Sequence, residues 1–187
     1  RQRQMCIRDS PMSTEMILNQ ISPTNFRVDI PDNSYMKGLT LQVQGVTLPS
    51  MNLPAVDIPA NMMVRGKVPG SAFEFDPLMI RFVVDEEMRS YLGIYIWMLS
   101  TNDYNEFNSV AWDDPKQSFA VHILDNSQMK TIATFRFYGA FPTNLGEVEL
   151  GYTNDSDEAV TCMATFGFLH MEVEIDGKVV TSQKRMS

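Results

Sequence analysis

Three consecutive carboxylates, Asp85, Glu86 and Glu87, form the densest acidic group in the sequence. Paired carboxylates can hydrolyse glycosides, and carboxylate oxygens can also bind calcium or magnesium. Both tasks need side chains that converge on one point, and adjacent residues on a helix do not face one another. The group directly precedes an apolar stretch with helical spacing, where an aspartate can accept hydrogen bonds from free N–H groups. We therefore expect Asp85 to cap a helix.

The other residue types that often catalyse reactions are few. His122 and His170 are the only histidines, and the strand-like alternation around His122 favours a structural position. The two cysteines, Cys6 and Cys162, suggest neither a disulfide framework nor a metal site. The sequence contains no glycine-rich phosphate loop, nucleophile elbow or metal-ligand spacing. We therefore expect no catalytic residue, no cofactor and no bound metal. The sequence predicts a protein that is not an enzyme.

The composition is that of a globular, acidic protein. Hydrophobic residues make up 44% and charged residues 20%, the net charge is −8, and the pI is about 4.7. A protein that binds nucleic acid by neutralising phosphates needs a basic surface, so this balance argues against that class. No apolar run approaches the roughly 20 residues of a membrane span, so we predict no membrane partner.

The carboxylates lie inside the stretch Leu78–Leu99, around which the chain is organised. Leu78–Val84 is rich in β-branched and aromatic residues and predicts a strand. The helix predicted after Asp85 is apolar on every side, which indicates burial on more than one side. One face would carry Met88, Tyr91, Leu92, Tyr95 and Leu99, and the other faces would carry Ile94, Ile96, Trp97 and Met98. Since little else is helical, we expect Ile94, Trp97 and Met98 to contact another subunit.

Most of the remaining chain predicts strands. Alternating or β-branched segments cover Ile21–Ile30, Leu39–Leu48 with a bulge or bend at Gly45, Ser118–Leu124, Lys130–Tyr138, and Val160–Ile175 as one long strand bent at Gly167. Phe141–Asn144 is expected to be a turn, and Asp176-Gly177 is a strong hairpin signal. The fold class is therefore mainly β with one good helix, and we expect one domain over residues 12–187. Residues 1–11 resemble a translated sequencing adapter or a disordered tail, outside the fold.

The segment Pro49–Gly70 is proline-rich and apolar at once. Proline removes backbone donors and favours extended, edge-like chain. Two interpretations stay open, a loop packed on its own domain and an arm that reaches a neighbouring subunit or ring. The residues expected to make the arm's contacts are Pro49, Met51, Leu53, Pro54, Ile58, Pro59, Met62 and Met63.

Near the C-terminus, acidic residues share one predicted strand face. His170, Glu172, Glu174 and Asp176 would point away from Leu169, Met171, Val173 and Ile175, and Glu147 and Glu149 make a shorter version of the pattern. A solvated outer face would explain the pattern. The alternative interpretation is a surface that must repel a polyanion.

Four short motifs, in order, carry a resemblance to a known family. They are Thr47-Leu48-Pro49, Val68-Pro69-Gly70, Val84-Asp85-Glu86 and Phe141-Pro142-Thr143-Asn144. Their order and spacing from Ile21 to about Ile175 resemble the tail tube family of contractile-tailed bacteriophages, which includes paralogues that join tube to baseplate. None of the motifs is a catalytic signature.

The resemblance implies a β-sandwich or barrel with a flanking helix. It also implies hexameric rings that stack into a hollow tube in the virion, assembled in the host cytoplasm, with sheath and baseplate proteins as partners. DNA would pass through the lumen without specific binding, and Glu147, Glu149, Glu172 and Glu174 are the expected lumen-facing residues, because a negative wall offers phosphate no cation.

A carbohydrate- or host-surface-binding β-sandwich is the alternative. Trp97 and Trp112 would then supply the stacking surfaces. A glycosidase using carboxylates near Asp85 is a weaker hypothesis, because no pairing of base and nucleophile is visible.

Overall fold

The computed structural model describes residues 20–30, 43–59, 62–109, 118–152 and 159–181. Within these residues the protein is mainly β, with one α-helix, α1 (Arg89–Thr101), which confirms the predicted fold class. No helix in the described part is long and apolar enough to cross a membrane. The leader 1–11 and Trp112 lie outside the described residues.

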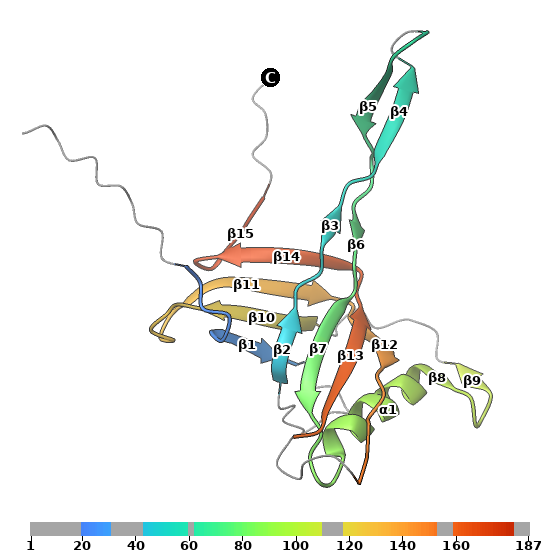
Figure 1. The fold of residues 1–187 in the computed structure, drawn as a ribbon, viewed down its shortest axis with the longest axis vertical. Coiled ribbons are helices and arrows are strands. Elements are labelled where there is room, and N and C mark those ends of the chain that lie inside the picture. Colours follow the sequence, from blue (N-terminus) through green and yellow to red (C-terminus); the bar gives the residue numbers. More distant parts are fainter. Residues whose placement is uncertain (1–19, 31–42, 60–61, 110–117, 153–158, 182–187) are drawn as a thin grey trace, which may run out of the picture.

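Two antiparallel sheets form the body of the subunit (Figure 1). Sheet A has the order β1 (Phe26–Asp29), β10 (Ser118–Leu124), β11 (Thr131–Tyr138), β14 (His170–Ile175) and β15 (Lys178–Val179). Sheet B has the order β12 (Phe141–Leu145), β13 (Thr161–Gly167), β7 (Leu78–Val83) and β2 (Val43–Thr47). The strand alternation of the sequence places one face of each sheet in a shared core.

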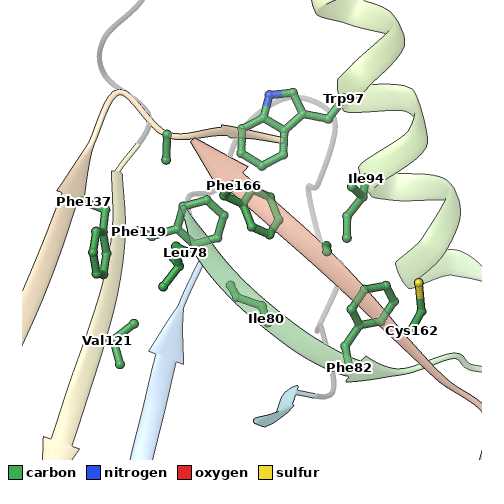
Figure 2. Close-up of a cluster of buried hydrophobic side chains, with 12 residues drawn as sticks. Leu78, Ile80, Phe82, Ile94, Trp97, Phe119, Val121, Phe137, Cys162 and Phe166 are labelled. Carbon is green, nitrogen blue, oxygen red and sulfur yellow. The ribbon is translucent and has the colours of Figure 1, made fainter. Parts of the chain in front are cut away.

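An aromatic cluster joins the two sheets to the helix. The ring centroids of Trp97 and Phe119 lie 6.0 Å apart, and those of Phe119 and Phe166 lie 4.7 Å apart. Figure 2 shows Ile94 and Trp97 projecting from α1 toward this cluster. Each of the three elements thus contributes a ring, since Phe119 belongs to β10 and Phe166 to β13. The other fully buried large side chains are Leu78, Ile80, Phe82, Val121 and Phe137.

The orientation of α1 corrects the predicted subunit contact. Ile94 and Trp97 are 0% and 2% exposed in the subunit's own core, so the prediction that they face another subunit is wrong for these two residues. Small Ser90 and Gly93 share the buried side and let the helix approach the core closely. The exposed stripe carries Met88, Leu92 and Ile96, and Met98 is half-buried.

The last strands also differ from the prediction. Val160–Ile175 is two strands in different sheets, β13 and β14, because the chain leaves sheet B after Gly167 and enters sheet A at His170. Leu169 sits at this corner and is exposed rather than inward-facing. Phe141–Asn144, predicted as a turn, lies in strand β12. The helix end continues into a small hairpin of β8 (Asn102–Asp103) and β9 (Asn108–Ser109).

Two local predictions are confirmed. The register of β2 against β7 shifts between Val43 and Gly45, which is the expected bulge. Asp176 and Gly177 join β14 to β15 with positive φ angles of 49° and 77°, as a two-residue hairpin turn requires.

Candidate functional site

The segment between β2 and β7 forms a long two-stranded arm that projects from the body (Figure 1). Its base pairs β3 (Met51–Asn52) with β6 (Glu74–Phe75), and its outer part pairs β4 (Ala55–Pro59) with β5 (Arg65–Pro69). The Gly70 N–H donates a 2.7 Å hydrogen bond to the Pro54 carbonyl where the two parts meet. We refer to Met51–Phe75 as the arm.

The outer arm is amphipathic. Cross-strand register places Val56 opposite Val68 and Ile58 opposite Gly66 on one face. The other face carries the pairs Asp57–Lys67 and Pro59–Arg65. Both faces are exposed, and so are Met62 and Met63 near the turn. An isolated two-stranded hairpin is marginally stable in water, so its apolar face needs a surface to cover it.

The Asp85 carboxylate lies at the start of α1, although it does not occupy the N-cap position. The chain first turns through Met88, which has a left-handed φ of 53°, and the helix begins at Arg89. The two carboxylate oxygens accept hydrogen bonds from the Arg89 and Ser90 N–H groups at 3.2 and 3.1 Å. The Ser90 hydrogen bond, reinforced by that from Arg89, lowers the pKa of Asp85 from its ordinary value.

Asp85→Ala should therefore lower the melting temperature at pH 7. The pKa of Asp85 is lower in the folded than in the unfolded state, so its stabilisation is present above the unfolded pKa and is lost as the pH falls through the folded pKa. Thermal melts from pH 7 to pH 2 should show the gap between wild type and variant closing at acidic pH. Glu86→Ala, at an exposed neighbour, is the control and should track wild type. A gap that persists unchanged at pH 2 would contradict this role.

The outward side of sheet A carries most of the polar chemistry of the body. The strand register brings polar residues of four strands onto this one side, which we call the polar face of sheet A. Its residues are Arg27, Asp29, His122, Thr134, Arg136, Tyr138, His170, Glu172 and Glu174. The two arginines and three carboxylates give this face a net charge of −1 when the histidines are neutral.

Almost every charge on the polar face of sheet A has a partner. Arg136 donates to both oxygens of Glu174, at 2.8 and 3.3 Å, and this bond raises the arginine pKa. The Tyr138 hydroxyl donates to Glu172 at 3.1 Å, which raises the tyrosine pKa. At the other end, Arg27 pairs with Asp29. Glu172 and Glu174 therefore belong to a hydrogen-bonded network rather than to a bare acidic strip.

The other polar residues singled out in the sequence lie in different places. Glu147 and Glu149 are exposed in a segment that forms no strand after β12, so the structure does not bring them onto the face of Glu172. His122 contacts Thr134 at 2.9 Å and Asp29 at 3.1 Å within the polar face. No group of three or more potential metal ligands occurs among the described residues. Burial raises the pKa of the Cys162 thiol, which makes it a poor nucleophile.

Sequence reasoning missed the cations of this face. Thr134, Arg136 and Tyr138 occupy alternate positions of β11, so the alternation alone predicts that they share one side of the strand. That Arg136 lies beside Glu174 depends on the pairing of β11 with β14, which are distant in the chain. No local signal specifies that pairing.

The comparisons with known proteins agree with this architecture. The family model described as phage tail tube protein matches residues 8–173. The tail tube terminator protein of Enterobacteria phage T4 is 38% identical over 168 residues, which cover 89% of this chain and 96% of that protein.

Two solved structures share the fold at low sequence identity. A chain of the anti-feeding prophage tube terminating cap has a TM-score of 0.60 and 14% identity, covering 91% of this chain and 99% of that one. A chain of the PVC sheath-tube complex in its extended state also has a TM-score of 0.60 and 14% identity, covering 85% and 94% of the two chains. The chain belongs to the phage tail tube protein family.

Proposed function

We propose that this protein forms a hexameric ring that ends the tail tube of a contractile-tailed phage. The observation that carries the proposal is the projecting arm, whose apolar face is exposed in the single subunit and fits a role in binding an adjacent ring. The relative named a tail tube terminator favours an end ring over the repeating tube. The protein then acts as a structural part of the virion, assembled in the host cytoplasm, with no catalytic activity.

The polar face of sheet A suits the wall of the channel. Lysines and arginines that are free to bind phosphate displace the counterions of DNA and hold it, whereas paired ones do so weakly. Arg136 and Arg27 are already engaged by Glu174 and Asp29. DNA would therefore slide past Glu172 and Glu174 during ejection without specific binding. We do not include Glu147 and Glu149 in this wall.

The exposed stripe of α1 is a further surface that an assembly would cover. Leu92 and Ile96 are 46% and 48% exposed, whereas half-buried Met98 lies off this stripe, because residues two apart on a helix do not face the same way. We propose that this stripe, rather than Ile94 and Trp97, faces other tail components, with sheath and baseplate proteins as the expected classes of partner. The glycan-binding alternative loses one stacking residue, because Trp97 is buried.

Imaging and mass measurement of the purified protein test the proposal. We expect electron micrographs to show rings, and native mass spectrometry to give six times the chain mass. Added to purified tail tubes of the same phage, the rings should bind at one tube end and stop further growth. A protein that remains monomeric at high concentration, or rings that add on repeatedly, would exclude an end ring.

A further inference from the structure

The outward side of sheet B is uncovered by the described residues and is hollowed. Leu78, Ile80 and Phe82 of β7 face the core, so Met79 and Arg81 between them face outward. Two adjoining hollows of about 540 and 550 Å³ lie on this side and share Arg81 and Met163. We call them together the Arg81 hollow; the other residues that line it include Gln44, Thr47, Thr161, Thr165 and Glu147, whose carboxylate makes no ion pair with Arg81.

Arg81 has no carboxylate partner among the residues that the structure describes. Its side chain is exposed, and no carboxylate of the described residues lies within 4.0 Å of it. Arg27, Arg89 and Arg136 each have a carboxylate partner within the subunit, whereas Arg65 on the arm, like Arg81, has none among the described residues. The methionines on either side of Arg81 add apolar surface. The part of the hollow formed by Arg81, Met79 and Met163 is therefore suited to a segment that combines a carboxylate with an apolar side chain.

The β8–β9 turn, residues 103–107, offers that combination. Phe107 is 95% exposed, and the neighbouring Glu106 carboxylate makes no ion pair with any described residue. The Asp103 carboxylate accepts from the N–H groups of Asn105 and Glu106 at 2.8 and 3.3 Å, which fixes the shape of the turn. The Tyr104 hydroxyl lies 2.7 Å from that of Tyr95, tying the turn to α1.

The turn and the hollow lie on different parts of the subunit. In Figure 1 the β8–β9 hairpin extends from the end of α1 away from β2, whereas β2, β7 and β13 line the hollow. Each copy thus carries the protruding β8–β9 turn on one side and the Arg81 hollow on another. Contacts of this head-to-tail kind generate closed rings when the rotation between copies closes.

We propose that neighbouring copies in the ring join by inserting the β8–β9 turn of one copy into the Arg81 hollow of the next. Glu106 of one copy pairs with Arg81 of its neighbour, and Phe107 packs on the methionines of the hollow. The inference rests on the proposed ring function, and it names the side-to-side contact that the arm does not supply. It requires no cofactor.

Charge exchange gives a decisive test because every copy carries both halves of the contact. Arg81→Glu makes both sides of the contact negative, and Glu106→Arg makes both sides positive. Each variant alone should therefore sediment as a monomer at concentrations where wild type forms rings. In an equimolar mixture of the two single variants, alternating copies bring opposite charges together at every contact, so rings should form again. The double variant R81E/E106R should also form rings. Phe107→Ser should weaken assembly at least tenfold without any change of charge.

Arg65→Glu makes the same charge change on the arm and is the matched control, which should form rings as wild type does. All the substituted side chains are exposed, so thermal melts should overlay. If the single variants form rings as wild type does, or if their mixture stays monomeric, this contact is wrong and the ring proposal stands. A wild-type protein that forms no ring would overturn both.

Discussion

Trp97→Ala should destabilise the isolated subunit by about 3–5 kcal/mol, the cost of deleting a large buried aromatic side chain. Trp97 contacts both sheets through its ring, stacking on Phe119 of sheet A and tilting against Phe166 of sheet B at 5.9 Å. Its loss opens a cavity where the helix and the two sheets meet. Since single domains are typically stable by only about 5–15 kcal/mol, a loss of this size is a substantial fraction of the total.

Urea denaturation followed by far-UV circular dichroism measures this effect directly. Leu92→Ala, on the exposed side of the same helix, is the matched control and should change stability by less than about 0.5 kcal/mol. If Trp97→Ala folded as stably as wild type and lost only its assembly, the helix would face the other way. The pair of variants therefore separates a core residue from an interface residue.

The helix illustrates what the sequence could predict and what it could not. Its place after a buried strand and its carboxylate at the start were readable from residue types alone. Its rotation was not, because an all-apolar helix gives no periodicity to choose a side. The buried side carries the two small residues Ser90 and Gly93 together with Ile94 and Trp97.

The strands, too, include features that the sequence predicts and features that it does not. The hairpin of β10 and β11 and the turn at Asp176-Gly177 were predicted, since both rest on neighbouring residues and turn chemistry. The passage from β13 to β14 was not, because a continuous apolar alternation gives no sign that the chain changes sheets near Leu169. The Arg136–Glu174 pair was missed for a related reason, as it depends on a long-range strand pairing.

Excising the outer arm should leave the subunit folded and abolish its binding to an adjacent ring. The Gly70 N–H and the Pro54 carbonyl are already hydrogen-bonded, so Asn-Gly can replace residues 55–69 with a short turn. None of the described residues in the excised segment belongs to the core. The melting temperature should stay close to that of wild type, while co-sedimentation with purified tail tubes should disappear. A variant that fails to fold would show that the arm packs on its own subunit.

The two faces of the arm give a sharper version of the same prediction. The triple variant V56S/I58S/V68S removes the apolar face and should abolish tube binding, because each such side chain contributes roughly 1.5–3 kcal/mol when fully buried. The control A55S/D57S/K67S alters as many residues on the opposite face and should bind tubes. Equal loss in both variants would mean that the arm acts as a spacer of fixed length. Loss confined to the apolar face would identify the surface by which one ring holds the next.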